Sequence, residues 1–244
     1  MRPIDSHCHL EFEEFDSDLE EVISEVEKRL TRAVLAGCGF KDNEKAVETA
    51  EKSKTLRYCL GLHPLYHQEN KVEDIREQIS RNDPVAIGEI GLDYNYITGR
   101  EERENSIEIF KQMLEIAEEE NLGAVIHSRN AERKAFELAQ EFDVKCFFHC
   151  FNGTPELAQE IASEGHYIGV TGQVFHSKRV QNIVESIGVE NMLLETDAPY
   201  LGLEDRNTPL LVQDVAGEVA DIKGLEYEEV VRKTSENSEN FYSV

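Results

Sequence analysis

Two histidines one residue apart, His7 and His9 in the segment PIDSHCHLEF, form a pattern near the start of the chain that can bind metal. In a strand, successive side chains point to opposite faces, so both imidazoles point to one side while Cys8 points to the other. The same pattern also occurs at strand ends whose histidines are only hydrogen-bonded. The pair therefore predicts a metal site only if other ligands converge on it.

Later segments of the chain end in residue types that also bind metals. Short apolar runs are followed by a histidine or a carboxylate, and these residues are His63, Glu89, His127, His149 and Asp197. If the runs are parallel strands of a barrel, their carboxyl ends meet at one face, and side chains far apart in the sequence become neighbours. So many ligand-type residues at one end of a barrel are difficult to attribute to chance.

The elements that must position these residues alternate regularly along the chain. The predicted strands span residues 3–8, 32–38, 57–63, 85–92, 123–128, 146–151, 167–172 and 191–199, and helix-like segments span 17–30, 43–53, 101–120, 130–142, 154–165 and 177–188. Units of about 27 residues predict the α/β class and a single (β/α)8 TIM barrel. A doubly wound open sheet is the alternative, but the first turn lacks its glycine-rich phosphate-binding fingerprint. Since no linker interrupts the pattern, we expect one domain over residues 1–244.

The charge balance limits how the protein can bind nucleic acid. The chain has 50 acidic and 25 basic residues, which gives a net charge of −25. Such a surface does not hold a phosphate backbone through general electrostatic attraction. A phosphate-containing substrate would need a local counter-charge from divalent cations or from a few placed basic side chains. Most of the acidic residues are expected on solvated helix faces.

The cysteines and the apolar runs indicate the compartment. Five cysteines at scattered positions do not form a disulfide framework, so we expect reduced thiols, with Cys8 and Cys150 as small core residues. No basic segment followed by an apolar run opens the sequence, and no run approaches the roughly 18 apolar residues of a membrane span. We expect a soluble, cytoplasmic protein that does not associate with a membrane.

Six motifs together resemble a known family. The segments IDSHCHL, GLHP, GEIGLDY, VIHSR, FHCFNG and LLETDAPYL occur in this order and resemble the successive motifs of the TatD family of metal-dependent deoxyribonucleases, which are amidohydrolase-like barrels. The later segments RNTPLLVQDVA and NSENFY are similar to the last segments of that family. The resemblance implies a DNA exonuclease that takes part in DNA repair and acts through a metal-activated water.

The resemblance also implies a ligand set for two divalent ions. The first ion would be held by His7, His9, Glu89 and Asp197, and the second by Glu89, His127 and His149, with Glu89 as the bridge. Two cations roughly 3.5–4 Å apart can clamp a phosphate and activate a water. Asp197 and Glu89 are then the catalytic residues, with Asp197 accepting the proton of the attacking water. Magnesium or manganese is implied for activity, although the histidines also suit zinc, iron or nickel.

Four neighbouring residues have secondary roles in this interpretation. Arg129 is expected to bind a substrate phosphate, although a salt bridge to a nearby carboxylate is an equal alternative. His63 is expected to contact the phosphate or the leaving group without binding metal. Glu195 is expected to support a ligand from behind, with an additional metal as the alternative, and Asp93 to orient a ligand or close its loop.

Two departures from the family pattern concern the substrate. Many relatives have another histidine after GLHP, where this chain has Leu65. The loop after LLETDAPYL is short and contains only Arg206 as an obvious basic residue. We therefore expect a small pocket that processes the ends of nucleic acid, with DNA as the first candidate. We also expect a monomer without an obligate protein partner.

Two other functions remain as alternatives. The same barrel and metals could hydrolyse a carboxylic ester or amide, including the ester of a mischarged aminoacyl-tRNA, as a D-aminoacyl-tRNA deacylase does. Many dinuclear amidohydrolases place a carbamylated lysine at the end of the fourth strand, where this chain has Glu89, which favours the TatD branch. A non-catalytic metal-binding protein is the third interpretation.

Overall fold

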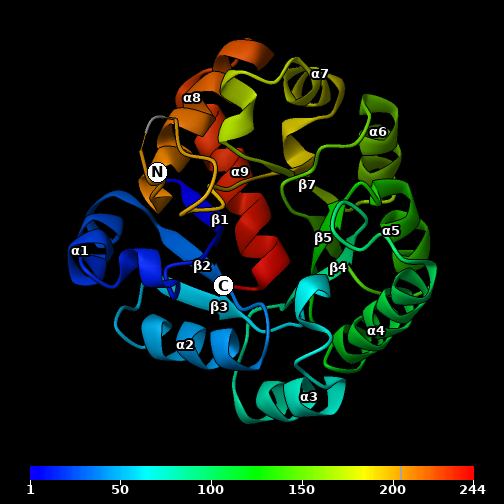
Figure 1. The fold of residues 1–244 in the computed structure, drawn as a ribbon. Helices are drawn as coiled ribbons and strands as arrows, with labels where there is room; N and C mark the ends of the chain where they lie inside the picture. The colour runs from blue at the N-terminus through cyan, green and yellow to red at the C-terminus, as the bar shows by residue number, and fades with distance from the viewer. Residues whose placement is uncertain (204) are drawn as a thin grey trace.

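Parallel strands and outer helices alternate through the computed structural model, which describes residues 1–203 and 205–244 (Figure 1). The strands are β1 (Ile4–Cys8), β2 (Arg32–Ala36), β3 (Leu56–Cys59), β4 (Ile87–Asp93), β5 (Ala124–Arg129), β6 (Cys146–Phe148), β7 (Tyr167–Val170) and β8 (Met192–Leu194). The α-helices are α1 (Leu19–Arg29), α2 (Phe40–Ala50), α3 (Val72–Arg81), α4 (Arg100–Glu119), α5 (Glu132–Ala139), α6 (Pro155–Ser163), α7 (Lys178–Ser186), α8 (Val212–Lys223) and α9 (Tyr227–Tyr242).

The strands form a ring in chain order. Neighbouring strands pair in parallel, in the order β1-β2-β3 in one sheet and β4-β5-β6-β7-β8 in the other. Isolated parallel bridges close both seams, between Leu60 and Ile87 and between Cys8 and Ala198. At the second seam, the His9 amide donates a hydrogen bond of 2.7 Å to the Ala198 carbonyl. This closed order confirms the predicted (β/α)8 barrel and brings the carboxyl ends of all eight strands to one face.

Helix α9 packs at the opposite end of the barrel. The Asn237 amide donates hydrogen bonds to the carbonyls of Val189 and Met192, where β8 begins. The Tyr242 hydroxyl donates to the Ser6 carbonyl of β1, and Phe241 and Tyr242 belong to the apolar cluster that also contains Val34 and Phe147 of the strands. With α9 against the amino end of β8, the carboxyl ends of the strands remain accessible for a site.

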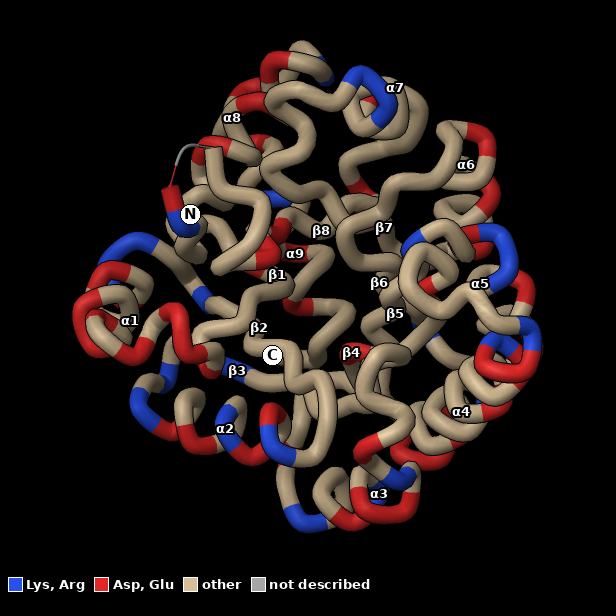
Figure 2. Tube along the Cα trace, in the orientation of Figure 1, with Lys and Arg blue, Asp and Glu red and all other residues tan. Residues whose placement is uncertain are grey.

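The outer helices bury one apolar stripe each. In α3, for example, Val72, Ile75 and Ile79 are buried at the spacing of one helix face. The exposed faces carry the acidic residues, which are dense on α1, α3 and α4 (Figure 2). Within the described ranges, no helix combines the length and the apolar character that crossing a bilayer requires.

The predicted element boundaries were wrong in several places. The predicted strand 191–199 ends at Leu194, and the predicted strand 146–151 ends at Phe148. Asp197 and Cys150 have φ values of 55° and 46°, in the left-handed region that a strand cannot contain. Cys150 also lines a cavity and is partly exposed, so its prediction as a core residue was wrong, whereas Cys8 is buried. Helices α3, α8 and α9 were not predicted.

Candidate active site

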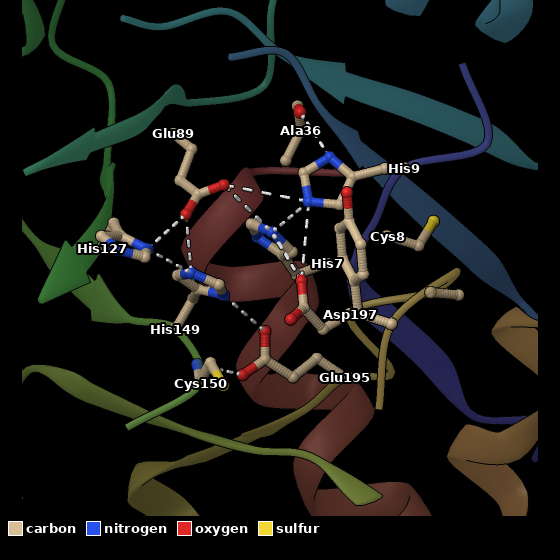
Figure 3. A network of polar contacts seen from close by, with 12 residues as sticks. His7, Cys8, His9, Ala36, Glu89, His127, His149, Cys150, Glu195 and Asp197 are labelled. Carbon is tan, nitrogen blue, oxygen red and sulfur yellow. Dashed lines mark hydrogen bonds and ion pairs between the residues drawn. The ribbon is translucent and has the colours of Figure 1, made fainter. Parts of the chain in front are cut away.

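The six predicted metal ligands lie together at the carboxyl ends of five strands. They come from β1, β4, β5 and the segments that follow β1, β6 and β8, and Figure 3 shows their side chains pointing toward one centre. The residues are His7, His9, Glu89, His127, His149 and Asp197. Residues from distant parts of the sequence therefore lie close together at one end of the barrel, as the predicted fold requires.

Four of these side chains surround one position. The Nε2 atoms of His7 and His9 are 3.2 Å apart. Oε2 of Glu89 lies 3.6 Å and 3.8 Å from these two nitrogens, and Oδ1 of Asp197 lies 3.7 Å and 3.5 Å from them. Two atoms that bind one ion at about 2.0–2.2 Å lie no more than about 4.4 Å apart. The distances within this donor set are therefore compatible with one divalent cation.

The other oxygen of Glu89 faces a second set of donors. Oε1 lies 2.8 Å from Nδ1 of His127 and 2.7 Å from Nε2 of His149. These two ring nitrogens are 3.4 Å apart. Figure 3 shows the Glu89 carboxylate between the two groups of histidines. A bridging carboxylate must present one oxygen to each of two cations, and Glu89 has this arrangement.

Burial and charge act against each other at these groups. Burial raises the pKa of the Glu89 carboxyl, but the neighbouring His149, His63 and His127 together outweigh burial and hold this pKa well below its usual value. Burial lowers the pKa of the His149 imidazole, but Glu89 and Glu195 outweigh burial, and this pKa lies well above its usual value. Buried charge of this density is costly in a structural core, and it suits a centre that holds cations.

His127 is oriented from behind by Asp93. Its Nε2 atom lies 3.1 Å from Oδ2 of Asp93, which leaves Nδ1 directed at Glu89. Oδ1 of Asp93 accepts hydrogen bonds from the amides of Asn95 and Tyr96 at 2.9 Å and 3.0 Å. The carboxylate is thus fixed by its own loop, and it fixes the ring in turn. These contacts are compatible with both roles predicted for Asp93, which remain predictions.

Glu195 stands behind His149. Its Oε1 accepts a hydrogen bond of 2.5 Å from the Cys150 amide, and its Oε2 lies 3.5 Å from Nδ1 of His149. The latter two atoms are buried and make no hydrogen bond to the described residues. The donor atoms of His7, His149 and Glu195 are also close enough for one ion. Both predicted interpretations of Glu195, support of His149 and binding of an additional metal, are compatible with this geometry.

Two participants were missed in the sequence. Nδ1 of His9 lies 2.9 Å from the Ala36 carbonyl and 3.2 Å from Oε1 of Glu11, which is buried. The signal for Glu11 is its place two residues after His9, in the turn that follows β1. Sγ of Cys38 lies 3.7 Å from Oε2 of Glu89. A small polarisable residue directly after β2 is its only signal.

His63 and Arg129 occupy different depths of the site. Nε2 of His63 lies 3.7 Å from Oε1 of Glu89, and burial lowers the pKa of this imidazole to about 3, so the ring is neutral. Its position beside His127 also suits a metal ligand, which the sequence did not predict. Arg129 is exposed at the rim, where its guanidinium lies 5.3 Å from the centre of the Tyr96 ring. Its predicted role as a phosphate contact remains a prediction.

The site lies in a cavity of about 720 Å³, which is within the usual range for ligand sites. Its lining includes His9, His63, Glu89, His127, His149 and Asp197 together with Arg129. Arg206 lies elsewhere: it pairs with Asp18 and covers the ring of Phe15. The last loop thus contributes aromatic and apolar side chains to this cavity but, within the described residues, no cation.

Comparison with known proteins places the chain in a family. The model of the TatD related DNases matches residues 4–243. An uncharacterized metal-dependent hydrolase of Methanocaldococcus jannaschii, MJ1582, is 36% identical over 99% of this chain and 97% of its own. The human deoxyribonuclease TATDN3 is 30% identical over 96% and 92%. The crystal structure of a TatD family hydrolase from Entamoeba histolytica superimposes with a TM-score of 0.89 at 25% identity, over 99% of this chain and 98% of the other. Together with the donor sets around Glu89, these matches establish that the chain belongs to the family of TatD related DNases and is a metal-dependent hydrolase.

Proposed function

We propose that this protein hydrolyses phosphodiester bonds at the ends of DNA, as an exonuclease with a dinuclear metal centre. The observation that carries the proposal is the carboxylate of Glu89, whose two oxygens face separate donor sets at the base of one cavity. The family and the name of the human relative TATDN3 support DNA as the substrate.

Each residue of the site has a role that follows from its position. Two divalent cations, magnesium or manganese in the working enzyme, would polarise the phosphate and make a water acidic. His7, His9, Glu89 and Asp197 would hold one cation, and Glu89, His127 and His149 would hold the other. The Asp197 carboxylate lines the cavity, where it accepts the proton of the attacking water. His63 and Arg129 bind the phosphate or the leaving group.

The proposal extends to the architecture of the protein. Residues 1–244 form one domain, since α9 returns to β1 and β8 and packs against both. The protein is a cytoplasmic monomer. It acts on strand ends, because a net charge of −25 opposes the binding of long duplexes.

The deciding experiment uses chelator-treated protein reloaded separately with magnesium, manganese and zinc. Single- and double-stranded DNA and RNA, each labelled at either end, are incubated with it beside a mischarged aminoacyl-tRNA. Stepwise loss of nucleotides from one end of DNA supports the proposal. Release of the amino acid without cleavage of DNA would instead assign carboxylic ester hydrolysis.

Matched variants exclude a contaminating nuclease. Glu89→Gln removes the bridging charge and should abolish cleavage, whereas His176→Ala alters an exposed histidine that does not line the cavity. Cleavage that is equal in both variants would show that the activity does not depend on Glu89 and would refute the proposed centre.

A further inference from the structure

The cavity above the donor sets has two chemically different walls. The loops after β1, β3 and β8 contribute the apolar wall, which consists of Phe12, Leu65, Tyr66, Tyr200 and Leu201. The carboxyl end of β5 and helix α7, which follows β7, contribute Arg129 and Arg179, and these two residues form the arginine wall. Because the strands close into a ring, the loops of the apolar wall stand on one side of the mouth and those of the arginine wall on the other.

The apolar wall runs from a candidate metal ligand out to solvent. The ring of Phe12 is stacked on that of His9, with the centroids 4.6 Å apart. Tyr200 makes an edge contact with Phe12 at 6.2 Å, and it is 50% exposed. Large apolar side chains that stay exposed at the mouth of a cavity mark a binding surface, and aromatic rings there suit nucleobases.

The arginine wall carries charge that the protein itself does not neutralise. Within residues 1–203 and 205–244, neither Arg129 nor Arg179 has a carboxylate oxygen within the 4.0 Å of an ion pair. Arg129 lies over the Tyr96 ring, and Nη1 of Arg179 donates a hydrogen bond of 3.1 Å to the Asn152 carbonyl. Both side chains are exposed but held in place, in a chain with a net charge of −25. Their remaining N–H donors suit phosphate oxygens.

We propose that the two walls bind different parts of one nucleotide end. The terminal base stacks on the apolar wall, chiefly on Tyr200, and the next phosphate along the strand binds Arg129 and Arg179. The scissile phosphate then lies between them, above Glu89. This inference rests on the proposed phosphodiesterase function and adds that the enzyme needs a base but does not read its identity, because every base has a face that can stack.

The test compares two single-stranded oligothymidylates that differ only at the residue removed first. One ends in thymidine, and the other ends in a tetrahydrofuran residue that has the sugar and phosphate but no base. Tyr200→Ala should lower kcat/KM about 10-fold on the first substrate and leave the second unchanged, while Tyr200→Phe should retain activity on both. Leu203→Ala is the control, because Leu203 is exposed on the same loop and does not line this cavity.

The arginine wall should show the opposite selectivity. Arg129→Ala and Arg179→Ala should raise KM on both oligonucleotides by similar factors, because both substrates keep the phosphate. Arg133→Ala is the control, since Arg133 pairs with Glu160 on the outer surface. An equal loss on both substrates in Tyr200→Ala, or an effect of the arginines on one substrate only, would overturn the inference.

A binding experiment separates this inference from the proposed function. Calorimetry measures the affinity of thymidine 5′-monophosphate and of 2-deoxyribose 5-phosphate for each variant. The wild type should bind the nucleotide at least 5-fold more tightly, and Tyr200→Ala should remove this difference. If no oligonucleotide is cleaved with any metal, the proposed function fails, and these affinities alone decide whether the apolar wall binds a base. If the wild type binds the nucleotide and the sugar phosphate with equal affinity, the apolar wall does not bind a base.

Discussion

Oε1 of Glu89 lies 2.7 Å from Nε2 of His149, while Oε2 of the same carboxylate faces His7 and His9. The fourth strand therefore supplies a carboxylate that directs one oxygen to each donor set. Removing the negative charge of Glu89 should weaken metal binding while the protein still folds, so the effect of metal loss can be measured separately from misfolding.

Glu89→Gln keeps the size of the side chain but provides only one good acceptor oxygen. We expect turnover to fall by roughly 100-fold or more and the bound metal to decrease, because two cations then repel each other without a shared anion. Metal analysis and thermal unfolding on the same sample check this. A folded variant with full metal content and near wild-type turnover would remove Glu89 from the mechanism.

Asp93→Asn should weaken the hold on His127 without removing a ligand. Its carboxylate lies 3.1 Å from the ring, and loss of such support typically lowers metal affinity roughly 10–100-fold. Competition with a chromogenic chelator measures the effect. Asp83→Asn, an exposed change near the start of the same strand, is the control. Equal affinities in the two variants would contradict the role of Asp93.

Metal uptake should release protons. Burial lowers the pKa of His149, but Glu89 and Glu195 raise it well above the usual value of 6.5, so the ring is protonated at pH 7 without metal. The stability gained from this raised pKa is full below 6.5 and is lost as the pH rises through the folded-state pKa. Because metal binding needs the neutral ring, the heat of zinc binding should depend on the ionisation enthalpy of the buffer. Heats that do not vary between buffers would disprove proton release.

Asn237→Ala should reduce stability without changing the chemistry. The buried amide donates to the carbonyls of Val189 and Met192 at 2.8 Å and 2.9 Å. Its loss removes both bonds, and the Val189 carbonyl keeps only the hydrogen bond from the Met192 amide. We expect a loss of about 2–3 kcal/mol in the free energy of unfolding by denaturant. Asn240→Ala, on the exposed face of the same helix, should have little effect. Turnover per folded molecule should be unchanged in both.

Salt should weaken DNA binding only slightly. With Arg129 and Arg179 on the same phosphate, side chains neutralise about one phosphate, and log affinity should fall with log salt with a slope of about 0.7 on single strands. Titration of a labelled oligonucleotide at several salt concentrations measures this slope, and a chelator should abolish binding. Steep, chelator-resistant binding to long duplex DNA would point to a basic surface elsewhere.

Local patterns in the amino-acid sequence predicted much of this protein's architecture. Alternating apolar runs and amphipathic segments predicted all eight strands and the barrel, because burial on both faces of a parallel strand leaves a nearly continuous apolar run. The chain order of His7, His9, Glu89, His127, His149 and Asp197 at strand ends predicted that they would meet. By contrast, α3, α8 and α9 were missed, although Val72, Ile75 and Ile79 of α3 have helical spacing.

The tertiary structure decided which atoms face each other. Residue types and spacing determined that ligand-type side chains would gather at the carboxyl ends of the strands, since that follows from the barrel alone. They did not determine that the two oxygens of Glu89 divide between two donor sets, or that Glu11 and Cys38 join them. Nor did they place Tyr200 and Arg179 in the lining of the same cavity. Those relations depend on side-chain rotation and on loop paths, which are set by packing between segments far apart in the chain and therefore leave no local pattern.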